Sequence, residues 1–241
     1  MLVPEIESST VNVGGLNTYL SRPEGGSAAG MLLLPMITGI GAQVREFADT
    51  LAGDGVTALS WDPWRGRPSA DETPMDVLFK WMGELDDEAS LAEMGQLLDY
   101  LHGDLGCQKV GTIGWCLGGR FALMLGGIDP RLVNVVAYHP TVPGNPHPNH
   151  TLDAVEYTAR IQAPVMMLYP GADDLVPVQS FQRLQAALQS RAEGASIVHS
   201  YPGAEHGFSA RFRHSNPVNA RASHLAWPQA VAFIQATTQV D

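Results

Sequence analysis

Short, almost unbroken runs of apolar residues recur along the chain and alternate with longer segments in which apolar residues recur at helical spacing. Continuous apolar runs are typical of strands that are buried on both faces of a sheet. These runs fall at 31–34, 56–60, 109–113, 132–138, 164–169 and 196–201. The segments with helical spacing fall at 41–53, 86–104, 117–127, 177–191 and 225–237.

This alternation predicts an α/β fold with a mostly parallel central sheet and helices on both faces, because crossover helices link parallel neighbours. Near the N-terminus, TVNV and LNTYL flank Gly14-Gly15, which predicts an antiparallel hairpin at the sheet edge. The proline-dense stretch 139–150 predicts a loop. Because the 241 residues contain no internal repeat and no low-complexity tail, we expect a single domain over residues 1–241.

Composition narrows the class of protein. The hydrophobic share of 45 % is enough to fill the core of one such domain. The formal net charge is −11 and no basic run is present, so neither nucleic acid nor an anionic membrane surface is an expected partner. Residues 1–20 lack the pattern of a signal peptide, and the apolar run at 31–37 is too short to span a bilayer. With no export signal, Cys107 and Cys116 are expected to be free thiols in a cytoplasmic protein.

The stretch GTIGWCLGGR, residues 111–120, places Cys116 between glycines where a predicted strand turns sharply into a predicted helix. A side chain at such an elbow projects above the sheet edge, and the small neighbours let strand and helix approach closely. The start of the helix also favours a thiolate. This pattern predicts a nucleophile. The alternative is a buried structural cysteine beside glycines that serve packing alone.

A cysteine nucleophile needs a base, and the base needs an orienting carboxylate. Asp173 and Asp174 follow the predicted strand 164–169, and His206 follows the strand 196–201. Both loops lie beyond the carboxyl ends of strands, where ligands bind in such sheets. Taken alone, Asp173 is equally a helix cap or turn former and His206 an ordinary loop histidine. The elbow upstream favours their catalytic interpretation.

The motifs GWCLGG, GADDLVP and AEHGF, in this order, resemble the dienelactone hydrolase family of α/β-hydrolases, and the resemblance covers most of the chain. It implies Cys116 as nucleophile and His206 as base. It also selects Asp173 over Asp174, because the family aspartate lies three residues before the Val-Pro pair. Family enzymes hydrolyse esters or lactones without a cofactor, so we expect a covalent acyl-cysteine intermediate and no cofactor.

Two backbone N–H groups are expected to hold the oxyanion of the reaction. One belongs to Leu117, the residue after the nucleophile, and the resemblance implies Ile37, in the loop after strand 31–34, as the other. Four side chains are expected to contact substrate: Met36, Trp115, Tyr138 and Phe208. For the aromatic residues among them, packing in the core is the alternative.

Two departures from the family pattern bear on substrate. Members that act on dienelactone carry a glutamate against the catalytic thiol, where this chain has Met36, and a carboxylate-binding arginine where this chain has Ala210. An anionic dienelactone is therefore not the expected substrate. Without a competing carboxylate, the thiol proton would pass to His206 and leave a resting thiolate–imidazolium pair. Desolvation beside Met36 acts in the opposite direction, by raising the pKa of the thiol.

Two classes of function follow. The first is a cofactor-independent hydrolase of small neutral esters or lactones, either a monomer or a homodimer. The second is a non-hydrolytic protein that binds a small ligand, or a redox-sensing thiol protein that uses Cys116 as its switch. The histidine and aspartate favour the first, because a sensor needs neither. The tract of His139, His147 and His150 does not predict a metal site, because it lies in a proline-rich loop.

Overall fold

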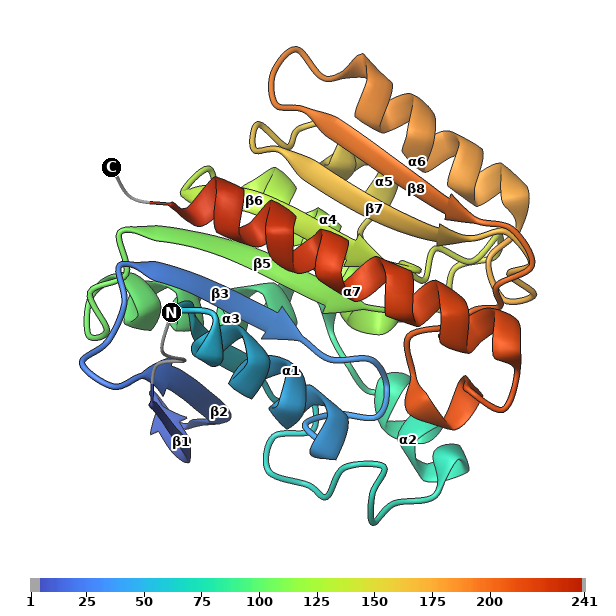
Figure 1. The fold of residues 1–241 in the computed structure, drawn as a ribbon. Helices are drawn as coiled ribbons and strands as arrows, with labels where there is room; N and C mark the ends of the chain where they lie inside the picture. The colour runs from blue at the N-terminus through green and yellow to red at the C-terminus, as the bar shows by residue number, and fades with distance from the viewer. Residues whose placement is uncertain (1–4, 240–241) are drawn as a thin grey trace.

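The computed structural model describes residues 5–239, and its strands form one eight-stranded sheet in the order β1-β2-β4-β3-β5-β6-β7-β8 (Figure 1). The strands are β1 (Ile6–Val13), β2 (Leu16–Pro23), β3 (Ala29–Leu34), β4 (Thr57–Trp61), β5 (Lys109–Trp115), β6 (Leu132–Tyr138), β7 (Val165–Pro170) and β8 (Ser196–Tyr201). Every strand predicted from an apolar run is present, with bounds shifted by at most two residues.

From β4 to β8, neighbouring strands of the sheet run parallel, whereas β2 is antiparallel to both β1 and β4. The turn between β1 and β2 is formed by Gly14 and Gly15, with φ of 58° and 96°, which is the left-handed backbone that tight hairpin turns require. The prediction of a mostly parallel sheet with an N-terminal antiparallel hairpin is confirmed.

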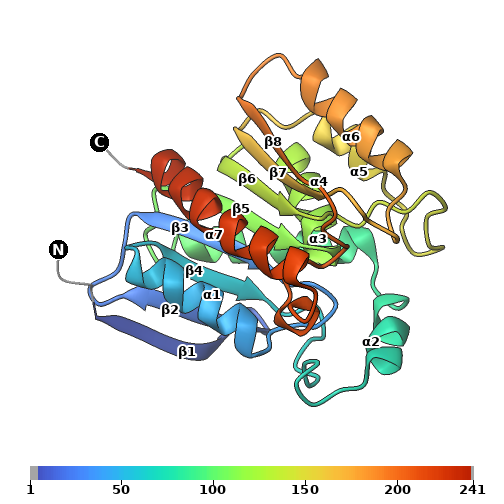
Figure 2. The ribbon, with the colours of Figure 1, turned by 45° about the vertical axis from the view of Figure 1, so that its right-hand side comes forward.

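Seven α-helices accompany the sheet in the described residues. They are α1 (Ala42–Gly53), α2 (Met75–Met82), α3 (Asp87–His102), α4 (Leu117–Ile128), α5 (Ala154–Thr158), α6 (Val178–Ser190) and α7 (Pro217–Thr238). Helices α1 and α7 cover one face and share one apolar cluster, whereas α3, α4 and α6 contribute to a second cluster on the other face (Figure 1). Helix α2 lies on neither face but beyond the carboxyl ends of the strands (Figure 2).

Three helices differ from the sequence-based expectation, and one of them is the five-residue α5, which was not predicted. Helix α7 begins at Pro217 instead of 225, because the Asn216 side chain accepts a hydrogen bond of 2.9 Å from the Val218 N–H and caps the helix. The first two turns of α7 contain few large apolar residues, so they lack the apolar spacing from which a helix is predicted. Helix α2 was not predicted, and it buries only Leu78. Its apolar residues Met75, Leu78, Phe79 and Met82 recur at helical spacing, but the pattern extends over only eight residues, which is too short to identify a helix firmly.

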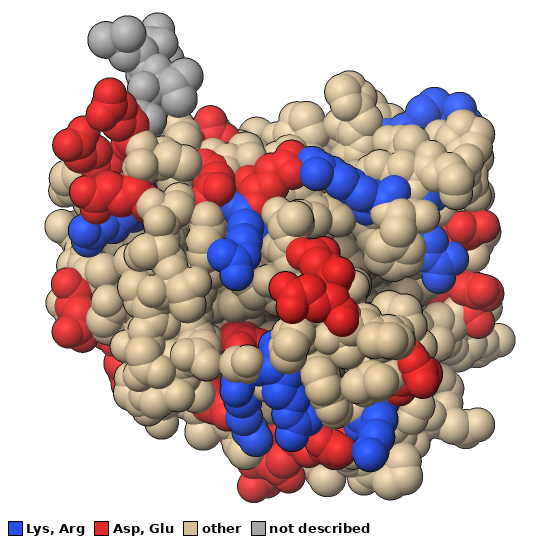
Figure 3. All heavy atoms as spheres, turned by 90° about the horizontal axis from the view of Figure 1, so that it is seen from below, with Lys and Arg blue, Asp and Glu red and all other residues tan. Residues whose placement is uncertain are grey.

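The surface bears on the expected partners. On the face shown in Figure 3, Lys and Arg side chains lie next to Asp and Glu side chains instead of gathering in one basic patch. None of the helices within residues 5–239 has the length and hydropathy that a bilayer-spanning helix needs. The single domain over 1–241 stays a prediction, supported by the common sheet.

Candidate active site

Cys116 occupies the sharp turn between β5 and α4. Its φ of 53° and ψ of −113° are strained for a residue with a side chain. Two backbone hydrogen bonds hold this conformation: the Cys116 N–H donates to the Tyr138 carbonyl at 3.0 Å, and the Thr141 N–H donates to the Cys116 carbonyl at 3.1 Å. The elbow is therefore fixed by the end of β6 and the loop after it.

The glycines around Cys116 are required by close approach of the backbone. A Cβ atom on Gly114 would lie 2.0 Å from the Gly118 carbonyl oxygen. A Cβ atom on Gly118 would lie 1.9 Å from the carbonyl oxygen of Leu34, at the end of β3. Only glycine fits at these separations, so the glycines let α4 start directly against β3 and β5.

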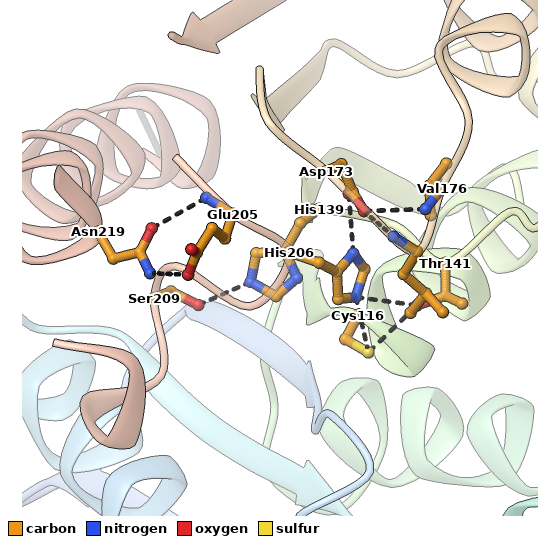
Figure 4. A network of polar contacts seen from close by, with 10 residues as sticks. Cys116, His139, Thr141, Asp173, Val176, Glu205, His206, Ser209 and Asn219 are labelled. Atoms are coloured by element: carbon orange, nitrogen blue, oxygen red, sulfur yellow. Dashed lines mark hydrogen bonds and ion pairs between the residues drawn. The ribbon is translucent and has the colours of Figure 1, made fainter. Parts of the chain in front are cut away.

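The three predicted polar residues come together at the carboxyl ends of β5, β7 and β8 (Figure 4). His206 Nε2 lies 3.2 Å from the Cys116 sulfur, and His206 Nδ1 lies 2.8 Å from Asp173 Oδ2. The other oxygen of Asp173 accepts hydrogen bonds of 2.9 Å from the N–H groups of Leu175 and Val176. Asp173 is thus held in place, with one oxygen left for the imidazole.

The electrostatics of the pair follow from burial and contact. Burial acts to raise the pKa of the Cys116 thiol, but the charge of His206 and hydrogen bonds from His206, Thr141 and the Leu117 N–H outweigh it and lower that pKa. Burial acts to lower the pKa of His206, whereas the Cys116 thiolate and the Asp173 carboxylate raise it to about 10. Both directions favour a resting thiolate–imidazolium pair, so the effect of the charge partners exceeds that of desolvation.

Thr141 is a site residue that the sequence analysis missed. Its hydroxyl donates a hydrogen bond of 3.1 Å to the Cys116 sulfur and lies 3.4 Å from His206 Nε2. Thr141 follows β6, the strand between β5 and β7 in the sheet. A polar residue at the carboxyl end of that strand was the sequence signal that could have identified it as part of the site.

His139 lies behind the catalytic histidine candidate. Its ring is 5.1 Å from that of His206, and its Nε2 lies 2.8 Å from the Ser209 hydroxyl (Figure 4). Burial lowers the pKa of His139 well below its usual value, so the ring is neutral. The other two histidines of the tract, His147 and His150, pack together with ring centroids 5.1 Å apart. Across residues 5–239, no three His, Cys, Asp or Glu side chains are grouped as metal ligands.

A cavity of about 260 Å³ opens above Cys116 and is bounded by Thr141, His206 and largely apolar side chains. Met36 and Ile37, in the loop after β3, line it. The Gly39 N–H donates to the Met36 carbonyl at 2.9 Å, which fixes the Met36–Ile37 peptide plane and directs the Ile37 N–H away from that turn.

Three of the expected substrate contacts are corrected by the structure. Trp115, Tyr138 and Phe208 do not line the cavity, and each is at most 1 % exposed. They lie in the apolar cluster under α1 and α7, where the Trp115 ring stacks on Phe47 at 4.9 Å. Trp115, the last residue of β5, directly precedes Cys116, and its side chain lies on the face of the strand that packs into this cluster.

The structure also shows where Ala210 and the two arginines after it lie, which bears on whether the site can bind an anionic substrate. Ala210 is fully buried and does not line the cavity. Arg211 forms an ion pair with Glu46 in α1. Arg213 lines the cavity, and its guanidinium lies 3.8 Å from the Glu205 carboxylate. Arg213, the one arginine that lines the cavity among residues 5–239, is therefore partly neutralised.

A mostly parallel sheet with a strained strand-to-helix turn at Cys116, and with a histidine and a carboxylate in the loops after neighbouring strands, is the arrangement of an α/β-hydrolase. The model of the dienelactone hydrolase family matches residues 16–238. The chain belongs to the dienelactone hydrolase family and is a hydrolase of ester or lactone bonds.

Similar proteins agree with this assignment. The carboxymethylenebutenolidase of Rhodococcus opacus is 27 % identical over 212 residues, which cover 87 % of this chain and 82 % of that protein. A crystal structure from Klebsiella pneumoniae, described as a "Putative Dienelactone Hydrolase", superposes with a TM-score of 0.85 at 22 % identity and covers 95 % and 98 % of the two chains. A dienelactone hydrolase-like promiscuous phosphotriesterase from metagenomic libraries superposes with a TM-score of 0.75 at 20 % identity, covering 97 % and 98 %. These structures share the fold.

Proposed function

We propose that the protein is a cofactor-independent hydrolase of small neutral carboxylic esters or lactones that works through a Cys116–His206–Asp173 triad and an acyl-cysteine intermediate. The observation that carries the proposal is the position of the His206 ring, within hydrogen-bonding distance of the Cys116 sulfur on one side and of the Asp173 carboxylate on the other. This is the geometry that nucleophilic catalysis needs.

In the first half of the reaction, the Cys116 thiolate attacks the carbonyl carbon of the substrate and the carbonyl electron pair moves onto oxygen. The N–H groups of Leu117 and Ile37 stabilise that oxyanion, and one such donor is typically worth about 3 to 4 kcal/mol. When the tetrahedral intermediate collapses, the His206 imidazolium gives its proton to the leaving alcohol. An acyl-cysteine remains.

In the second half, neutral His206 takes a proton from water, and the resulting hydroxide attacks the thioester. The thiolate leaves, the carboxylic acid is released and the ion pair is restored. Asp173 contributes by accepting from His206 Nδ1, which fixes the tautomer in which Nε2 exchanges protons with the reactants.

The cavity supports a neutral substrate. Met36 stands on its wall where dienelactone-specific members of the family carry a glutamate, and Arg213 shares its charge with Glu205. The name carboxymethylenebutenolidase describes action on a lactone that bears a carboxymethylene group. For this chain we carry over the type of bond cleaved and not the charged substituent.

The test is sustained release of nitrophenol from p-nitrophenyl acetate by the wild type and by Cys116→Ala. We expect turnover that Cys116→Ala abolishes, and Cys107→Ser is the matched control because burial raises the pKa of that second thiol and it lies away from the cavity. Equal rates for the wild type and Cys116→Ala would refute Cys116 as nucleophile. A single stoichiometric burst without turnover would favour the ligand-binding or redox-sensing alternative.

A further inference from the structure

Exposed large apolar side chains are concentrated at the mouth of the cavity. In residues 5–239, eight such side chains are exposed, and four of them line this one cavity. These four are Met75, Phe79, Leu175 and Phe212, each 40 % to 64 % exposed. Single exposed apolar residues are ordinary, whereas a group gathered around a pocket marks a binding surface. We call these four side chains the apolar rim.

The apolar rim is assembled from three separate segments. Met75 and Phe79 belong to α2, Leu175 lies two residues after Asp173, and Phe212 lies in the short 3-10 helix after His206. The loops that carry the acid and the base therefore each carry a rim side chain as well. Three segments distant in sequence present apolar groups to one opening, which local sequence composition does not explain.

Helix α2 turns its apolar stripe toward the cavity. Met75, Phe79 and Met82 are spaced four and three residues apart, share one side of the helix and line the cavity. Leu78 is the only residue of α2 that is buried. An amphipathic helix that served packing alone would bury this stripe against the sheet.

The size of the cavity indicates what the apolar rim is for. At about 260 Å³, the cavity is smaller than the roughly 300 to 1,000 Å³ that is usual for sites enclosing a drug-sized ligand. It has room for the groups next to the scissile bond. A longer substituent on the carbonyl would leave the cavity across the apolar rim. The Arg213 side chain, which also lines the cavity, is paired with Glu205.

We propose that the apolar rim is a binding subsite for an uncharged hydrophobic arm of the substrate, a medium-length alkyl or aryl chain on the acyl side of the ester. This inference rests on the proposed hydrolase function and narrows its substrate class. Each methylene that the apolar rim covers raises kcat/KM about two- to fourfold, until the chain extends past the rim.

The experiment compares p-nitrophenyl acetate, butanoate, hexanoate and octanoate, because the leaving group is constant and only the acyl chain grows. For the wild type we expect kcat/KM to rise along the series. In Phe79→Ser and Phe212→Ser the ratio of octanoate to acetate kcat/KM falls about fivefold. Leu225→Ser is the matched control, because Leu225 is 57 % exposed on α7 and does not line the cavity. Circular dichroism verifies that each variant is folded.

Three results would overturn the subsite. One is a wild-type kcat/KM that does not change with acyl-chain length. Another is an octanoate-to-acetate ratio that changes equally in the rim variants and in Leu225→Ser. A rise seen only above the critical micelle concentration of the octanoate ester would assign the apolar rim to an aggregated lipid surface instead. Failure of the hydrolase proposal is distinct, because it would appear as absent turnover on every ester, acetate included.

Discussion

The Thr141 hydroxyl donates a hydrogen bond of 3.1 Å to the Cys116 sulfur, and the same oxygen lies 3.4 Å from His206 Nε2 (Figure 4). One neutral side chain thus contacts both Cys116 and His206. A hydroxyl donor stabilises a thiolate without competing for the proton, unlike a carboxylate in the same place. Thr141 therefore supports the charge state in which Cys116 is nucleophilic.

Replacing Thr141 by Val, which keeps the shape and removes the donor, should raise the pKa of the Cys116 thiol. A hydrogen bond to a charged group is worth about 1.5 to 3 kcal/mol, so kcat/KM should fall about tenfold or more. Thr141→Ser retains a hydroxyl and should keep most of the wild-type kcat/KM. If Thr141→Val and Thr141→Ser behave alike, the hydroxyl has no part in holding the thiolate.

The ion pair has a signature in the pH dependence of alkylation. The thiolate is the reactive form, and contact with His206 lowers the Cys116 pKa, so reactivity toward iodoacetamide should persist below the free-thiol pKa of about 8.5. It should disappear only as the pH falls through the lowered thiol pKa and the sulfur is protonated. Rates measured between about pH 5 and 9, with mass spectrometry to separate Cys116 from Cys107, test this.

Asp173→Asn is the companion variant in that titration. The Asp173 carboxylate helps to raise the pKa of His206, so its loss weakens the imidazolium and should move the alkylation midpoint of Cys116 upward. A wild-type midpoint at or above the free-thiol value would show that desolvation exceeds the effect of the charge partners. An unchanged midpoint in Asp173→Asn would remove Asp173 from the network.

The site contacts that were predictable from sequence depend mainly on topology. Cys116 follows β5 directly, Asp173 and His206 lie in the loops after β7 and β8, and parallel strands end at the same edge of a sheet, so their convergence follows from strand order. The choice of Asp173 over Asp174 came from the family resemblance. Thr141 follows a strand as well. Its contact with the sulfur, however, depends on the path of an irregular loop and on one side-chain rotamer, and neither has a periodic signal.

The cavity wall was the least predictable part for a related reason. Trp115 and Phe208 lie within two residues of Cys116 and His206 in sequence, but alternation along the strand and the turn after His206 direct both rings into the core. Three residues that do line the cavity, Met75, Phe79 and Met82, come from α2. That helix has only eight residues, so its helical spacing does not show from sequence that it forms part of the wall.

Trp64 supports the loop that carries the proposed oxyanion donor. Its indole N–H donates to the Ile37 carbonyl at 3.1 Å in a fully buried contact. Trp64→Phe keeps the ring packing but leaves that carbonyl without a partner, so the Ile37–Thr38 peptide should lose its fixed orientation, and the adjoining Met36–Ile37 peptide, which carries the donor N–H, should lose one of its two supports. We expect kcat to fall about tenfold with a smaller change in KM, because the lost interaction acts mainly in the transition state.

Trp81→Phe is the control for that measurement, since the Trp81 ring packs 5.8 Å from the Trp64 ring. It removes an indole from the same region without touching the Ile37 carbonyl. Steady-state kinetics on one p-nitrophenyl ester, with thermal unfolding in parallel, separate the two effects. A loss of stability in Trp64→Phe with kcat unchanged would place the hydrogen bond in folding and outside catalysis.

A buried ion pair anchors the helix that begins at the elbow. Arg120, in the first turn of α4, donates to both Asp87 oxygens at 2.6 and 2.7 Å, and both side chains are 2 % exposed. Asp87 also accepts from the Leu152 N–H at 3.0 Å, so the pair links α3, α4 and the segment before α5. Asp87→Asn leaves the guanidinium buried without its counter-charge, which typically costs about 3 to 5 kcal/mol of stability.

Asp99→Asn is the matched control, because Asp99 pairs with Arg131 at an exposed position and such pairs contribute about 0 to 1 kcal/mol. Burial acts to raise the pKa of Asp87, but the hydrogen bonds and charge of Arg120 outweigh it and lower that pKa. A lowered carboxyl pKa adds stability that is present above the ordinary value and is lost as the pH falls through the lowered one. Urea unfolding near neutral pH should therefore give a lower free energy of unfolding for Asp87→Asn than for the wild type. This difference in free energy should become smaller in strong acid. Equal unfolding free energies for the two asparagine variants would show that the buried pair does not hold α4 in place.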